Sequence, residues 1–126
     1  MPQLRSKRVY LPPESEDGCR VLVDRLWPRG LSRAKAQLDQ WQKDLAPSSA
    51  LRTWFGHRAE RFDEFALAYR NELEHNPLAS DFAGACRELL RQRNVTLLYA
   101  ARNAGCNHAL VLQAWLSARM HDLPDR

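Results

Sequence analysis

Three arginines recur at every fourth position in the segment 25–33, at Arg25, Arg29 and Arg33. Pro28 restricts the backbone before Arg29, and Gly30 allows a sharp turn after it. The planar guanidinium group of arginine donates two parallel hydrogen bonds to a carboxylate or a phosphate, which lysine does not. The spacing therefore predicts a loop that holds Arg25 and Arg29 toward an anion.

The alternative is a structural role for the same loop. Its arginines would then form ion pairs, and Trp27 would belong to the core. The carboxylates available for such pairs are Asp24, Asp39 and Asp44.

Arg52 is a further candidate for binding an anion. Together with His57 it flanks two aromatic residues, Trp54 and Phe55. We expect Trp54 to pack in the core with its neighbours exposed, and a functional site in this segment is the alternative.

The segment 101–108 contains a second set of polar residues. Asn107 is a favoured residue just before a helix, and the free N–H groups of a helix start attract negative charge. His108, in the first turn, and Asp24 are the candidates for acid or base catalysis. His108 also continues the apolar stripe of its helix, so a place in the core is its alternative role.

The chain has three cysteines, Cys19, Cys86 and Cys106. Cys106 adjoins a helix start, which lowers thiol pKa values and would favour a nucleophile. The sequence places no histidine beside it, so we expect an ordinary buried thiol. The cysteine and histidine spacings fit neither a Cys-x-x-Cys pair nor a zinc finger, and we expect reduced thiols, no metal site and no cofactor.

Two apolar runs predict buried strands at residues 20–24 and 95–100, and a third strand is expected at an edge of the sheet at residues 8–11. A crossover between strands of one sheet is right-handed in nearly all cases, which favours a parallel pair. Ligands of such sheets bind beyond the carboxyl ends of the strands. The loops 25–33 and 102–108 are therefore expected to meet at one edge.

Helical periodicity and capping residues predict helices at residues 47–56, 62–73 and 76–90, and from Asn107 onward. The fold class is therefore α/β and helix-rich, with a small, mostly parallel sheet of about three to four strands covered by helices.

We expect residues 1–126 to form a single domain. Loose termini are expected at 1–7 and 121–126, and a mainly helical insert at 32–93 separates the central strands.

The 126 residues include 19 Lys and Arg against 15 Asp and Glu, which gives a formal net charge of +4. No apolar run approaches the roughly 20 residues of a membrane helix, and the first eight residues lack the apolar segment of a signal peptide. We expect a cytoplasmic protein with no membrane partner. The standard motifs for nucleotide hydrolysis, dinucleotide binding, serine hydrolysis and zinc proteolysis are absent, which excludes the standard forms of those chemistries.

The run 20–30, which contains Val-Asp-Arg-Leu-Trp-Pro-Arg-Gly, resembles the YeaO-like branch of the family called domain of unknown function 488. The likeness continues through 38–48, 51–57, 97–101 and 107–109, and through Phe65, Tyr69, Glu72 and Leu73. It implies a small α/β domain of bacterial origin with no established activity.

Other branches of that family carry a Cys-His-Arg triplet in the loop after the last strand. The matching positions here are Asn107, His108 and Ala109, with Cys106 one residue upstream. The resemblance therefore implies a pocket that keeps the histidine, and it implies no substrate.

The leading hypothesis is an uncharacterised α/β domain with an anion-binding pocket, whose ligand is a nucleotide or another phosphorylated small molecule. His108 and Asp24 would supply acid or base chemistry if the protein is an enzyme, a question that the sequence leaves open. The residues expected to bind the anion are Arg25, Arg29, Arg52 and Asn107.

One alternative is a nucleic-acid-binding or regulatory interaction module without catalysis, suggested by the basic isoelectric point near 9.3. Another is a structural protein whose tryptophans lie in a core or an interface. The reaction type and the oligomeric state stay open.

Overall fold

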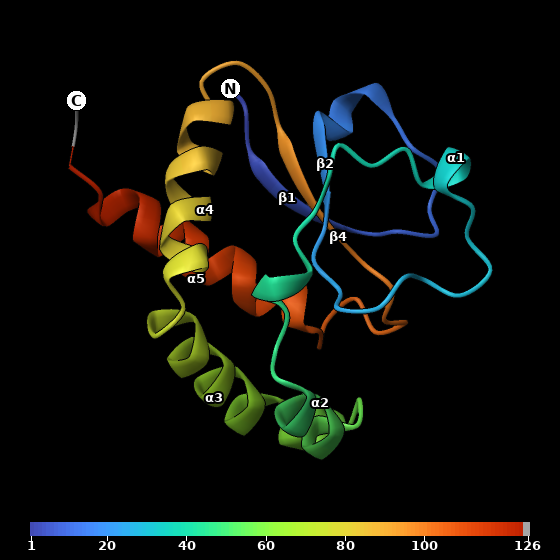
Figure 1. The fold of residues 1–126 in the computed structure, drawn as a ribbon, viewed down its shortest axis with the longest axis vertical. Helices are drawn as coiled ribbons and strands as arrows, with labels where there is room; N and C mark the ends of the chain where they lie inside the picture. Colours follow the sequence, from blue (N-terminus) through green and yellow to red (C-terminus); the bar gives the residue numbers. More distant parts are fainter. Residues whose placement is uncertain (125–126) are drawn as a thin grey trace.

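Four parallel strands form the sheet at the centre of the computed structural model, which describes residues 1–124 (Figure 1). The order across the sheet is β1-β4-β2-β3, and each pairing within these residues is parallel. The predicted α/β class with a small parallel sheet is therefore confirmed. The strands are β1 (Leu4–Arg8), β2 (Cys19–Leu22), β3 (Gln40–Trp41) and β4 (Val95–Tyr99).

The two central strands, β2 and β4, are buried along their whole length, which explains their nearly continuous apolar sequence. Successive side chains of a strand point to opposite faces of the sheet. Val21 and Leu97 accordingly belong to the main core, whereas Leu22 and Leu98 belong to a second, smaller core. Leu22 pairs with Leu98 across the two strands, so both strands end at the same edge of the sheet.

Helices cover the face of the main core, and Figure 1 shows α3, α4 and α5 together on this side. The side chains of Ser48, Asn76 and Asn107 accept hydrogen bonds from the first turns of α2, α4 and α5, as predicted for Asn107. Gly56 ends α2 with a left-handed φ of 53°. The helices are α2 (Ser49–Phe55), α3 (Phe62–Glu74), α4 (Pro77–Leu89) and α5 (His108–Asp122).

The opposite face is covered by the segment between β2 and β3, which includes the short helix α1 (Arg33–Ala36). Trp27 and Trp41 pack edge to face here, with ring centroids 5.5 Å apart, and contact the core around Leu22 and Leu98.

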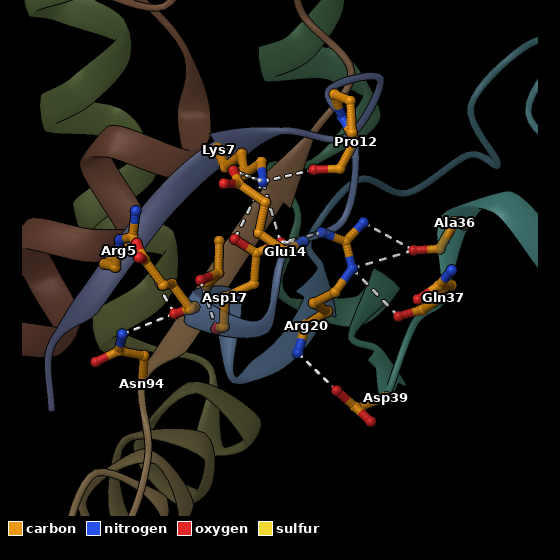
Figure 2. A network of polar contacts seen from close by, with 12 residues as sticks. Arg5, Lys7, Pro12, Glu14, Asp17, Arg20, Ala36, Gln37, Asp39 and Asn94 are labelled. Carbon is orange, nitrogen blue, oxygen red and sulfur yellow. Dashed lines mark hydrogen bonds and ion pairs between the residues drawn. The ribbon is translucent and has the colours of Figure 1, made fainter.

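A buried polar network lies on the same face, nearer the start of β2 (Figure 2). The carboxylate of Asp17, 1% exposed, accepts hydrogen bonds from Arg20 and, at 3.1 Å, from Lys7. Arg20 also donates to the carbonyl oxygens of Ala36 at 2.8 Å and Gln37 at 3.2 Å. The network therefore attaches the end of α1 to the start of β2.

Three expectations about the ends of the chain are wrong. Residues 4–7 are not loose, because they belong to β1, which pairs with β4. The edge strand thus begins four residues before the predicted segment 8–11 and shares only Arg8 with it. At the other end, α5 continues to Asp122, and Arg87 donates to the carbonyl oxygens of Leu123 and Pro124. Residues 125–126 of the predicted loose terminus lie outside the described residues.

The expected core position of Trp54 is also wrong. Its side chain is 39% exposed, and the guanidinium of Arg61 lies 5.0 Å from its ring centroid. The next residue, Phe55, is buried instead and stacks on Phe65 with a centroid distance of 4.2 Å. The two aromatics are adjacent on a helix, about 100° apart, so only one of them can face the core.

Candidate functional site

A cavity of about 580 Å³ opens at the carboxyl edge of the sheet. Three segments far apart in the sequence form its wall: the loop after β2, the loop between β4 and α5, and the helical insert around α2. The two loops expected to meet are therefore brought together. The polar residues of the wall are Asp24, Arg25, Arg52, His57, Arg102, Asn103, Asn107 and His108.

Asp24 and His108 lie side by side in this wall. The Oδ1 atom of Asp24 lies 3.0 Å from Nε2 of His108, and Oδ2 accepts a hydrogen bond of 3.1 Å from the backbone N–H of Ala100. Trp41 donates to the backbone oxygen of Asp24 at 2.7 Å, which holds the residue in place. Oδ2 is thus satisfied by the protein, whereas Oδ1 is buried close to Nε2 and accepts no hydrogen bond within residues 1–124.

His108 combines the two roles considered for it. Its side chain is 15% exposed, and it packs near the buried ring of Tyr69 with a centroid distance of 6.4 Å. Burial raises the pKa of Tyr69, whose hydroxyl donates to the backbone oxygen of Leu45. His108 is therefore packed against the core on one side while lining the cavity on the other.

Arg25 is anchored on one side of its guanidinium group. Nη2 donates to the carbonyl oxygens of Ala46 at 3.4 Å and Pro47 at 3.2 Å. Nε is buried and has no acceptor within residues 1–124. Ser48, next in the chain, is held in turn by the carboxylate of Glu72, which accepts from its N–H at 2.8 Å and from its hydroxyl at 2.6 Å. The insert therefore fixes the position of Arg25 in the cavity wall.

Asn107 is occupied with the structure of its own loop. Its Oδ1 accepts from the N–H of Leu110 at 3.1 Å, and its Nδ2 donates to the carbonyl of Asn103 at 2.9 Å. The side chain is 1% exposed. Asn107 therefore shapes the start of α5 at the cavity, as its capping role predicted, and its side chain is not free to bind an anion.

Arg52, His57 and Arg102 add positive or ionisable groups to the wall, and all three residues are exposed. His57 and Arg102 are not among the residues that the sequence pattern predicted to bind the anion. Arg102 is the first residue of the loop expected to reach this edge, and His57 follows the glycine that ends α2. His57 has a left-handed φ of 59°, which is uncommon for a residue other than glycine.

Arg29 does not join the cavity. It is exposed, and its backbone oxygen accepts a hydrogen bond of 2.8 Å from the hydroxyl of Tyr10. The chain leaves the cavity after Leu26 because Trp27 packs on the opposite face of the sheet. The expected pair of Arg25 and Arg29 around one anion is therefore not formed.

The ion-pair alternative for the arginine loop is wrong as well. Within residues 1–124, neither Arg25, Arg29 nor Arg33 forms an ion pair with a carboxylate. Arg33 lies over the ring of Trp27 instead, 4.5 Å from its centroid. Trp27 is half-buried against the second core, in agreement with its predicted packing role.

The three cysteines are free thiols. Burial raises the pKa of Cys19, and it raises that of Cys86 to about 12. Cys106 is partly exposed, and its N–H donates to Oδ1 of Asn103 at 3.1 Å. The described part of the chain contains no group of three or more His, Cys, Asp or Glu side chains arranged to hold a metal ion.

None of the helices formed by residues 1–124 has both the length and the apolar character needed to cross a membrane.

The chain belongs to the family described as the inactive DUF488-N3 subclade, whose model matches residues 3–125. It is similar to the uncharacterized protein YeaO of Escherichia coli (strain K12), with 41% identity over 114 residues that cover 90% of this chain and 96% of the relative. It is also similar to the uncharacterized protein Rv3073c of Mycobacterium tuberculosis (strain ATCC 25618 / H37Rv), with 40% identity over 117 residues, 93% of this chain and 96% of the relative. No solved structure gives a significant match.

Proposed function

We propose that this protein binds a phosphorylated small molecule, such as a nucleotide, in the cavity at the carboxyl edge of the sheet. The observation that carries the proposal is the charge of the cavity wall. Arg25, Arg52 and Arg102 line it, and Asp24, whose Oδ2 accepts from the N–H of Ala100, is the one carboxylate among its lining residues in the described chain. An anion would therefore meet three guanidinium groups and a single carboxylate.

The size and the apolar part of the cavity support the same proposal. Small-molecule sites have volumes of about 300–1,000 Å³ and combine an apolar wall with a few polar groups. Here Leu26, Pro47, Phe55 and Phe65 supply apolar surface. A ligand that carries both a charged phosphate and a flat or apolar part fits this combination.

Arg25 is the best-placed residue for the phosphate. Because Nη2 is held by two carbonyl groups, the guanidinium loses little rotational freedom when it binds. Its Nη1 group is not buried and has no acceptor within residues 1–124, so it is available to a ligand in the cavity. A hydrogen bond to a charged group contributes about 1.5–3 kcal/mol.

We propose binding rather than turnover. The family is described as inactive. The positions that resemble the Cys-His-Arg triplet of other branches hold Asn107 and Ala109 in place of the cysteine and the arginine, and Asn107 is occupied as a helix cap. We also propose a cytoplasmic location, which the three free thiols support.

Thermal unfolding in the presence of anions tests the proposal. The probes are inorganic phosphate, glycerol 3-phosphate and adenosine monophosphate. A ligand at one hundred times its Kd stabilises the folded state by about 2.7 kcal/mol, which raises the Tm of a domain of this size by roughly 10 °C.

Two variants of the same loop make a matched pair for this test. Arg25→Ala removes a residue of the cavity wall and should abolish most of the Tm shift, whereas Arg29→Ala removes an exposed arginine outside the wall and should leave the shift intact. The proposal fails if no phosphate shifts the wild-type Tm, or if the two variants respond alike.

Ionic strength separates this proposal from nucleic-acid binding. Binding through many backbone phosphates weakens steeply between low and physiological salt, while a small ligand held by a few arginines in a cavity weakens far less. A steep loss of affinity for duplex DNA, without any response to the small phosphates, would favour the nucleic-acid module.

A further inference from the structure

His108 contributes a feature that the arginines of the cavity lack. Its Nε2 atom lies 3.1 Å from the backbone oxygen of Val23 and 3.0 Å from Oδ1 of Asp24. A carbonyl oxygen only accepts hydrogen bonds, and so does an ionised carboxylate. A lone pair on Nε2 would face two oxygen atoms and be repelled by both, so the proton of the imidazole belongs on Nε2.

The position of that proton determines the character of the other ring nitrogen. In the neutral imidazole a proton on Nε2 leaves Nδ1 with a lone pair, which makes Nδ1 a hydrogen-bond acceptor. Nδ1 has no hydrogen-bond partner in the described chain, and it is not buried. It is therefore accessible, and the open space that His108 lines is the cavity.

The ring is also held in place. Nε2 is held by its hydrogen bond to the backbone oxygen of Val23, and the ring packs near Tyr69, which is itself 1% exposed. An acceptor whose orientation is already set binds a donor at a smaller entropic cost than a freely rotating side chain.

The surrounding side chains make this acceptor selective. The guanidinium groups of Arg25, Arg52 and Arg102 can only donate hydrogen bonds, so they match the phosphate oxygens of a ligand. Nδ1 of His108 instead needs an O–H or N–H group. A simple anion without such a group would leave Nδ1 without a partner.

We propose that Nδ1 of His108 accepts a hydrogen bond from the ligand, so that the cavity selects phosphate esters that also carry a hydroxyl or amino group. Sugar phosphates, polyol phosphates and nucleotides belong to this class, whereas alkyl phosphates do not. The inference rests on the proposed function, because it names the second group that a phosphorylated ligand must present.

Nuclear magnetic resonance tests the tautomer without any ligand. Long-range correlations between ring protons and ring nitrogens, recorded on protein with ¹⁵N-labelled histidine at alkaline pH where imidazoles are neutral, distinguish Nε2–H from Nδ1–H. We expect His108 to show the Nε2–H pattern. An Nδ1–H pattern would overturn the inference while leaving the proposed anion site intact.

Binding of a matched pair of ligands tests the selection. Glycerol 3-phosphate and n-propyl phosphate share the phosphate and the carbon chain, and differ in their hydroxyl groups. A hydrogen bond between neutral groups contributes about 0.5–1.5 kcal/mol, so calorimetry should give a Kd that is roughly 2- to 12-fold lower for glycerol 3-phosphate.

The variant His108→Phe keeps a ring of similar shape and removes the acceptor, so it should bind both phosphates equally. If this variant does not fold, the wild-type ratio and the tautomer still decide the matter. Equal wild-type affinities for the two phosphates would overturn the inference alone. Failure of both to bind would overturn the proposed function and the ligand selection with it.

Discussion

The substitution Asp17→Asn removes the negative charge at the centre of the network in Figure 2. The side chain of Asp17 is 1% exposed, and the cations that it faces, Lys7 and Arg20, are 11% and 5% exposed. Asparagine keeps nearly the same shape but cannot neutralise either cation. The substitution therefore leaves the charge of Arg20 buried without its partner.

The expected loss follows from that unpaired charge. Removing one member of a buried ion pair costs about 3–5 kcal/mol, which lowers the Tm of a domain of this size by roughly 10–20 °C. Urea denaturation at neutral pH measures the loss in the free energy of unfolding. The control is Glu14→Gln, because Glu14 also contacts Lys7 but is 65% exposed, and exposed pairs contribute about 1 kcal/mol or less.

The pH dependence provides a second check on the same residue. Burial alone raises the pKa of Asp17, but hydrogen bonds from the N–H of Glu14 and from Lys7 and Arg20 outweigh it and lower the pKa below its ordinary value of 3.8. A carboxylate with a lowered folded-state pKa stabilises the protein above its unfolded pKa, and this contribution is lost as the pH falls. The difference between wild type and Asp17→Asn should therefore shrink below about pH 4. A loss under about 1 kcal/mol at neutral pH, the usual range for surface changes, would refute this account of the network.

Three further predictions concern an exposed tryptophan, two glycines and two cysteines. Trp54→Ala should lower the free energy of unfolding, measured by urea denaturation, by about 1 kcal/mol or less, because the side chain is 39% exposed. A loss above about 3 kcal/mol would instead indicate that Trp54 packs in the core. Gly30→Ala should lower the free energy of unfolding by about 1–2 kcal/mol, because Gly30 has a left-handed φ of 75° but lies in open space. Gly18→Ala should lower it clearly more, since a Cβ there would lie 2.1 Å from a backbone oxygen, and equal losses for the two variants would contradict this. Iodoacetamide at about pH 8 should label Cys106 of the native protein before Cys86, because Cys106 is partly exposed whereas burial raises the pKa of Cys86 to about 12. Peptide mass spectrometry measures the order of labelling, and the reverse order would contradict the burial of Cys86.

Much of the fold could be predicted because local signals agree with one another. The runs 20–24 and 95–100 are apolar because both faces of β2 and β4 are covered, and the caps Ser48, Asn76 and Asn107 act within a few residues of their own position. Strand β1 was misplaced because its five residues are all half-buried and four of them are polar, so its sequence contains no apolar run and no alternation that would mark a strand.

The candidate site was predicted only in part. The meeting of the loops after β2 and β4 follows from parallel topology, which the sequence order indicates. Arg25 and Arg29 look equivalent in the sequence, yet only Arg25 lies in the cavity wall, because the intervening Trp27 packs on the other face of the sheet.

The sequence by itself determined the two central strands, the helices α2 to α5 and where most of them begin, and which edge of the sheet collects the polar loops. Tertiary structure decided which side chains share the cavity: it brought His57 and Arg102 to Arg25, excluded Arg29, and turned Nε2 of His108 toward Asp24 and Val23. The physical reason is the separation along the chain over which each of these interactions acts. Capping and periodicity act between residues a few positions apart, whereas the direction of a loop side chain depends on contacts with segments that are distant along the chain and close only after folding.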